Sequence, residues 1–315
     1  MKKFIGLVMS LLILSFPVMA AEFSDMPNDW STTALQNAVD NGLITGSDGK
    51  IRPGDYMTRA EMAAIMVRAF GASEEADISS FKDVSPSDWF YAPMAKAVKM
   101  GAFTGSDNLL EPSKNITREQ TFAVLSRMFS LNYDREINEY LKRGESAATT
   151  LSYFLDGDKV SAWAREDVAA IIASGYVNGN NGYINPSDYI SRAEFASVMN
   201  RMVTTYVDSE GAYMNFPKGN VLVRANGVSI SGAEIDGDLI IGEGAKDGAI
   251  VSNFKVTDRL IVRAGQKSSL KNGSCDTLRL ICPGVKASAA SVTRNVVYTV
   301  EGSELSVEVD VSLGE

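Results

Sequence analysis

The sequence predicts an α + β protein, with helical repeats in its N-terminal part and a parallel β-helix at its C-terminal end. The first observation is that each of the three tryptophans lies 29 residues before an arginine, with two glycines and a proline at fixed offsets between them. The sets are Trp30, Gly42, Gly46, Pro53 and Arg59; Trp89, Gly101, Gly105, Pro112 and Arg118; and Trp163, Gly175, Gly179, Pro186 and Arg192. Five residues at fixed spacing, three times over, indicate a threefold internal repeat.

The second observation is a run of short β-prone segments, rich in Val, Ile and Leu, that begins after about residue 216. They return every 18 to 21 residues and are separated by Gly, Asn, Asp and Ser. A period near 20 with one strong strand in each period predicts a parallel β-helix over residues 217–315. An antiparallel sandwich is the alternative, although its turns usually come every 8–12 residues, as a rough rule. The expected strands are Val221–Val223, Leu239–Ile241, Leu260–Val262, Leu278–Leu280 and Val296–Tyr298.

Each repeat predicts a helix, a loop and a second helix. Asp29 in the first copy and Ser161 in the third are the expected N-caps of the first helix. Gly42, Gly101 and Gly175 follow its last turn, where a left-handed residue ends a helix.

The second helix of each repeat begins with a capping box, a hydroxyl residue followed three positions later by Glu or Gln. The boxes are Thr58 with Glu61, Thr117 with Gln120, and Ser191 with Glu194. They place Arg59, Arg118 and Arg192 at the first helical position, where a cation opposes the helix dipole. A bound anion would reverse the sign of that interaction, because free N–H groups at a helix N-terminus and a guanidinium both favour anions. Alternatively, the arginines bond carbonyls or carboxylates of a neighbouring repeat.

Composition excludes several classes of function. Residues 1–20 read as a secretory signal peptide cleaved after Ala20, and no later segment is apolar enough to span a membrane. Without Lys2 and Lys3 the chain carries 28 basic and 39 acidic side chains and no histidine. A nucleic-acid partner, a metal site and a cofactor are therefore not expected. Cys275 and Cys282 form either a disulfide or two buried thiols.

A third set of repeated residues, Phe23 with Asp25, Phe81 with Asp83 and Phe154 with Asp156, opens each copy. Together with the Trp, Gly, Pro and Thr-Arg-Ala-Glu positions, this pattern resembles the S-layer homology domain. The resemblance divides the chain into repeats at 22–72, 79–131 and 152–205, with an added helix and linker at 132–150. It implies a pseudo-threefold spindle, with a three-helix central bundle and prongs.

The resemblance also implies the function of a secreted protein that is anchored non-covalently at the cell surface. Its expected partner is secondary cell-wall polysaccharide, often pyruvylated and anionic, or modified peptidoglycan. The implied ligand contacts lie in grooves between the repeats. They are Trp30, Gly46, Arg59, Trp89, Gly105, Arg118, Trp163, Gly179 and Arg192.

The three copies are not equal. The third has Asn178-Gly179-Asn180 where the others have Thr-Gly-Ser, so Arg192 is expected to contribute least. Taken alone, the tryptophans could instead belong to the core. We do not expect an enzyme, but the alternatives are a small carbohydrate-active enzyme or a structural or adhesive protein acting through the β region, whose self-assembly is left open.

Overall fold

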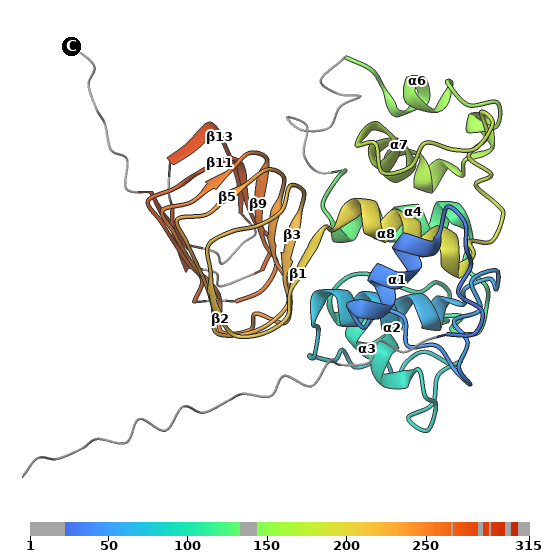
Figure 1. Cartoon of the computed structure of the whole chain (residues 1–315). Helices are drawn as coiled ribbons and strands as arrows, with labels where there is room; N and C mark the ends of the chain where they lie inside the picture. The colour runs from blue at the N-terminus through green and yellow to red at the C-terminus, as the bar shows by residue number, and fades with distance from the viewer. Residues whose placement is uncertain are drawn as a thin grey trace, which may run out of the picture.

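The computed structural model describes residues 23–132, 144–265, 267–282, 286–289, 291–299 and 304–307. It confirms the α + β architecture, with helices in the N-terminal part and a parallel β-solenoid of about four coils in the C-terminal part (Figure 1). The expected signal peptide and most of the added helix and linker lie outside the described residues. The helices are α1 (Thr32–Asp40), α2 (Arg59–Phe70), α3 (Tyr91–Lys99), α4 (Arg118–Met128), α6 (Ala147–Leu151), η1 (Gly157–Lys159), η2 (Ala162–Ala164), α7 (Arg165–Ala173) and α8 (Arg192–Met202).

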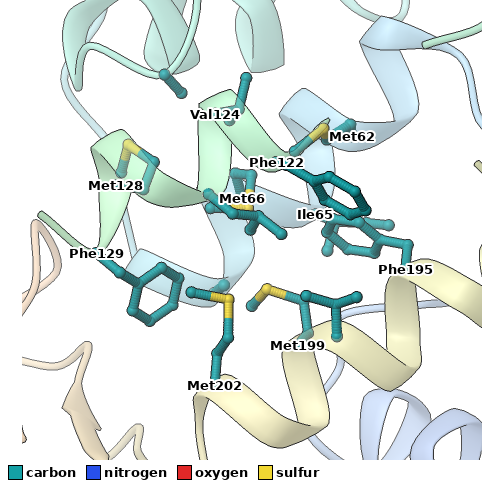
Figure 2. Packing of buried hydrophobic residues seen from close by; sticks show 14 of the residues in the cluster. Met62, Ile65, Met66, Phe122, Val124, Met128, Phe129, Phe195, Met199 and Met202 are labelled. Carbon is teal, nitrogen blue, oxygen red and sulfur yellow. The ribbon is translucent and has the colours of Figure 1, made fainter. Parts of the chain in front are cut away.

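The second helices of the three repeats, α2, α4 and α8, form the central bundle (Figure 2). Its interior is filled by large apolar side chains that are almost fully buried, among them Met62, Met66, Phe122, Phe129, Phe195, Met199 and Met202. The first helix of each repeat packs on the second helix of another: α3 on α2, α7 on α4, and α1 on α8. The last of these contacts closes the ring, so the first and third repeats are neighbours in space.

All three capping boxes are present as predicted, with the hydroxyl accepting from the N3 amide and the N3 side chain accepting from the N-cap amide. The two caps proposed for the first helices are wrong. Helix α1 begins at Thr32, and the carboxylate of Asp29 accepts from the amide and hydroxyl of Ser31 in the preceding loop. Helix α7 begins only after η2, and Ser161 donates both its amide and its hydroxyl to the buried carboxylate of Glu119 in the second repeat. In both places the side chain that was expected to cap the helix makes other hydrogen bonds instead, Asp29 with Ser31 and Ser161 with Glu119.

The solenoid strands are β1 to β14, and every strand pair described is parallel, which excludes the antiparallel sandwich. The expected segments lie in the sheet that contains β3, β6, β9, β11 and β13, where Leu222 aligns with Ile240 and Ile240 with Ile261. Cys275 and Cys282 remain thiols, and burial raises the pKa of Cys275 to about 12. The strands are β1 (Thr205–Val207), β2 (Gly211–Tyr213), β3 (Val221–Val223), β4 (Val228–Ser231), β5 (Glu234–Ile235), β6 (Leu239–Ile241), β7 (Ile250–Ser252), β8 (Lys255–Val256), β9 (Arg259–Val262), β10 (Ser269–Lys271), β11 (Ser274–Leu280), β12 (Lys286–Ala289), β13 (Ser291–Thr299) and β14 (Glu304–Val307).

The solenoid closes the C-terminal end of the helical bundle. Leu222, Ile240 and Ile261, from three successive coils, are buried in the same hydrophobic core as the bundle helices. Gly71, which ends α2 with φ +69°, lies against the backbone of the solenoid, and a Cβ there would collide with the carbonyl of Arg224. Glycine is thus required both for the left-handed turn and for the close approach of the two parts.

Three solenoid arginines complete this contact by donating to carbonyls at the ends of helices. Arg224 donates to Arg68 and Asn41, Arg259 to Ser130, and Arg263 to Met128 and Met100. Cations at helix C-termini complement the helix dipole, so each of these bonds stabilises the junction.

Candidate functional site

The opposite end of the bundle carries the Phe-x-Asp elements, the second repeated glycines and the repeated arginines. The Phe-x-Asp elements hold the prong loops: in the first copy the carboxylate of Asp25 accepts from the amides of Ile51 and Arg52, both at 2.8 Å. Asp83 and Asp156 make the equivalent pairs of bonds in the other copies.

The second repeated glycine has a structural reason in each copy. Gly46, Gly105 and Gly179 have φ of +62°, +70° and +67°, as the predicted left-handed turn requires. A Cβ at Gly46 would also collide with the ring of Phe23. The turn and the packing of the opening phenylalanine therefore account for this glycine without a ligand.

Each repeated arginine reaches into the next repeat. Arg59 Nε donates to the carbonyl of Leu110, Arg118 Nε to Ile184, and Arg192 Nε to Ile51, at 2.7–2.8 Å. The third bond returns to the first repeat and closes the cycle. The structure therefore supports the second interpretation of these arginines, namely that they link neighbouring repeats.

The expectation that the helix amides form an anion site is wrong. The amide of Arg192 donates to the carbonyl of Asp55, and the amide of Ala193 donates to that of Pro53. The first two amides of α2 and α4 are satisfied in the same way by a neighbouring repeat. A ligand at this end would therefore be bound by side chains rather than by helix N–H groups.

Two of the three arginines also pair with a carboxylate of the next repeat's capping box. Arg118 Nη1 lies 2.7 Å from Glu194, and Arg192 Nη1 lies 3.3 Å from Glu61. The equivalent partner of Arg59 is Gln120, which has no charge. Arg59 makes no ion pair within the part of the chain that the structure describes; its guanidinium lies 5.0 Å from the ring centre of Phe103. Burial lowers the pKa of Arg59.

The tryptophans are not core residues. The exposed fractions of Trp30, Trp89 and Trp163 are 68%, 64% and 59%. Core packing therefore does not account for the tryptophan of any copy, and its return at an exposed position in all three repeats keeps the contact interpretation open.

One cavity, which we call the Arg192 groove, is lined by a repeated tryptophan, a repeated glycine and a repeated arginine. It has a volume of about 630 Å³. Gly46 from the first repeat, Trp89 from the second and Arg192 from the third line it together. Four cationic side chains face two carboxylates there, and the pKa of Arg68 is lowered first by burial and then by the neighbouring charge of Arg192. The charged lining residues are Lys50, Arg52, Arg68 and Arg192 with Asp55 and Glu61.

A second cavity, the Arg118 groove, has a volume of about 500 Å³ and the opposite charge balance. Arg118 is its one cation, facing the carboxylates of Asp188 and Glu194. The remaining lining residues are Tyr56, Asn185, Ser187 and Tyr189. Neither Trp30 nor Gly179, which the threefold relation would place with Arg118, lines it.

The sequence analysis missed several residues of the two grooves. The signal for Arg68 was available, because Arg68, Arg127 and Arg201 recur at the repeat spacing and each donates to a carbonyl 25 residues earlier. Lys50 and Arg52 belong to the prong loop of the first copy alone and carried no repeat signal.

Within the described ranges, no three His, Cys, Asp or Glu side chains are arranged to hold a metal ion. No described helix is both long enough and apolar enough to cross a bilayer.

Comparison with known proteins places these repeats in a family. The model of the S-layer homology domain matches residues 22–63, 80–122 and 153–196. The chain is 30% identical to the surface-layer 125 kDa protein of Lysinibacillus sphaericus over 192 residues, which cover 58% of this chain and 15% of that protein. It is 28% identical to S-layer protein sap of Bacillus anthracis over 185 residues, covering 57% and 21%.

The chain is also similar to an enzyme. Identity to the amylopullulanase of Thermoanaerobacterium thermosulfurigenes is 28% over 179 residues, covering 56% of this chain and 9% of that enzyme. The matches therefore span only about a tenth to a fifth of the length of these three relatives. The cyclic contacts and the family match lead to one conclusion: the chain carries three tandem S-layer homology domains.

Proposed function

We propose that this exported, wall-associated protein is anchored non-covalently to the cell wall by binding an anionic wall glycan in the Arg192 groove. The observation that carries the proposal is the joint lining of one cavity by Gly46, Trp89 and Arg192, each from a different repeat. The S-layer homology domains and the surface-layer relatives support anchoring as the general role.

The charge of the groove favours an anionic ligand. Nε and Nη1 of Arg192 are held by Ile51 and Glu61, and Nη2 makes no hydrogen bond within the described part of the chain. Lys50 and Arg52 add flexible cations at the rim. A carboxylate such as that of a pyruvyl ketal would accept from these donors and offset the repulsion between Arg68 and Arg192.

The exposed indole of Trp89 supplies the other half of the recognition. Sugar rings present an apolar face of C–H groups, which stacks on an aromatic side chain, while their hydroxyls need polar partners. We infer that Trp89 holds a sugar ring next to the anionic substituent. Trp30, Arg59, Gly105, Arg118, Trp163 and Gly179 remain predicted contacts at the equivalent positions.

The proposed role is non-catalytic. The glycosidases among the relatives match this chain only over its repeat region, so this similarity gives no support for a catalytic role. The ligand is a secondary wall polysaccharide or a modified peptidoglycan, and the groove charge favours an acidic polymer.

Co-sedimentation with purified wall sacculi tests the proposal. We expect the wild type to sediment, Arg192→Ala and Trp89→Ala to lose at least tenfold in affinity, and chemical removal of the acidic polysaccharide to abolish binding. Tyr153→Ala is the matched control, because Tyr153 is 65% exposed, lines neither groove and is not a predicted contact. Unchanged binding by a folded Arg192→Ala/Trp89→Ala double variant would refute the proposal.

A further inference from the structure

Two tyrosines at the apex of the helical part join the two grooves. The rings of Tyr56 and Tyr189 lie 5.6 Å apart between centres and are tilted by 58°. They come from the first and third repeats. Their exposed fractions, 57% and 46%, are high for paired aromatic side chains. Neither hydroxyl makes a hydrogen bond within the part of the chain that the structure describes.

Backbone bridges between neighbouring repeats hold the main chain of both tyrosines. Tyr56 forms an isolated β-bridge with Ser191, and Tyr189 forms the equivalent bridge with Thr117. The third position of this set is Asn115, which bridges to Thr58. Two of three copies therefore place an aromatic at the apex, and the third places a small polar side chain.

Tyr56 lines both the Arg192 groove and the Arg118 groove, and Tyr189 lines the latter. The aromatic pair thus stands where the two cavities meet. The Arg118 groove carries an excess of carboxylates, and its cation lies 2.7 Å from Glu194. That cavity is unsuited to an anion, but its amide, hydroxyl and carboxylate groups suit neutral sugar hydroxyls.

We propose that Tyr56 and Tyr189 form a neutral-sugar subsite that carries the bound glycan from the Arg192 groove into the Arg118 groove. This inference rests on the proposed function. An anionic unit occupies the Arg192 groove, the next sugar stacks on the tyrosine pair, and further neutral sugars hydrogen-bond to Asn185 and Ser187. The ligand class is therefore an oligosaccharide stretch rather than a single modified terminus.

The test compares ligands of two lengths on the full mature chain. The probes are the intact acidic polysaccharide released from wall sacculi and the shortest acidic fragments from its partial hydrolysis, with affinity measured by calorimetry. We expect Tyr189→Ala, at the ring that lines only the Arg118 groove, to weaken binding of the polymer severalfold and to leave the short fragments unchanged, and Tyr56→Ala/Tyr189→Ala to weaken the polymer by about tenfold. Tyr56→Phe/Tyr189→Phe, which keeps the rings, should bind the polymer as the wild type does.

Other variants separate this proposal from the previous one. Arg192→Ala should weaken both probes alike, and if it weakens neither, the proposed function itself fails. Tyr183→Ala removes an exposed tyrosine that lines neither groove and should change nothing. If the folded tyrosine double-alanine variant binds the polymer normally, or Tyr189→Ala loses both probes equally, the subsite is refuted.

Discussion

Arginines meet the central bundle at both of its ends, but under opposite electrostatic conditions. At the C-terminal ends of the helices, solenoid arginines donate to helix carbonyls and complement the helix dipole. At the N-terminal ends, the repeated arginines are themselves the first helical residues and oppose it. The first set is Arg224, Arg259 and Arg263, and the second is Arg59, Arg118 and Arg192.

The difference teaches how to separate a structural arginine from a candidate ligand arginine in one fold. Arg263 is 6% exposed at its side chain, and its donors are occupied by two carbonyls, Glu243 and the Met128 sulfur. Arg192 is 13% exposed, lines a cavity and keeps Nη2 without a partner in the described chain. Arg263 should therefore act on stability alone, whereas Arg192, which also links two repeats, should act on both stability and binding.

The largest effect is expected from the buried ion pair at the solenoid junction. Arg259 and Asp238 lie 2.6 Å apart with side chains 3% and 4% exposed. Arg259→Ala leaves Asp238 buried without its cation, so we expect a loss of about 3–5 kcal/mol in the free energy of unfolding. Urea denaturation followed by circular dichroism measures it.

An exposed pair in the same solenoid is the control. Lys255 and Glu234 are also 2.6 Å apart between adjacent coils, but their side chains are 61% and 65% exposed. Water screens both charges, so Lys255→Ala should change stability far less than Arg259→Ala does. Equal losses at the two pairs would show that burial does not decide their contribution.

A crossed pair of variants tests the division between stability and binding. Arg263→Ala should lower the free energy of unfolding by about 2–3 kcal/mol, because two helix carbonyls and Glu243 lose their donor, while the folded fraction still binds sacculi. Arg192→Ala should cost about 1–2 kcal/mol, because Ile51 and Glu61 lose their donor, and its folded fraction should in addition lose wall binding at least tenfold. Denaturation and co-sedimentation on the same preparations check both. If Arg263→Ala and Arg192→Ala lose wall binding to the same extent, the two arginines do not differ in their role in binding.

The sequence predicted the repeat, the capping boxes and the solenoid period because each depends on neighbours in the chain or on a fixed spacing. It did not predict the junction with the solenoid, since nothing in Arg224 or Arg263 alone says which helix end they contact. The residues that line the grooves could not be predicted from the sequence either, because Gly46, Trp89 and Arg192 come from three different repeats. The repeat offsets grouped each tryptophan with the arginine of its own copy, whereas the Arg192 groove brings Trp89 of the second copy to the arginine of the third.

Alkaline pH should weaken the solenoid junction. Tyr176, whose hydroxyl accepts from Asn220, is partly buried, and the loss of solvent around it raises its pKa to about 12; the same cause raises the pKa of Tyr206 beneath Arg224. The unfolded chain releases these protons near pH 10, so stability is complete below that pH and is lost as pH rises toward the folded values. We expect a loss of about 1–2 kcal/mol per tyrosine by pH 12. Tyr176→Phe should flatten the pH dependence of unfolding, and an unchanged slope would contradict its burial as the cause.

The smallest expected effect concerns the one repeat junction without an ion pair. Gln120 caps α4 with bonds of 3.3 Å in both directions, whereas the backbone amides of Thr58 and Ser191 reach Glu61 and Glu194 at 2.7 and 2.8 Å. Gln120→Glu should tighten this cap and give Arg59 the carboxylate that the other two arginines have. We expect a gain of about 0.5–1 kcal/mol at low salt, smaller at high salt because the pair is partly exposed.

The reverse substitution, Glu194→Gln, removes the carboxylate that pairs with Arg118 at 2.7 Å and should lose a similar amount. Thermal unfolding of both variants at low and high salt measures the two changes. If Gln120→Glu fails to stabilise the chain while Glu194→Gln destabilises it, the repeats are not equivalent at this position. Arg59 would then be held by its contact with Phe103 and its bond to Leu110, and the threefold relation would hold for the backbone and not for the charges.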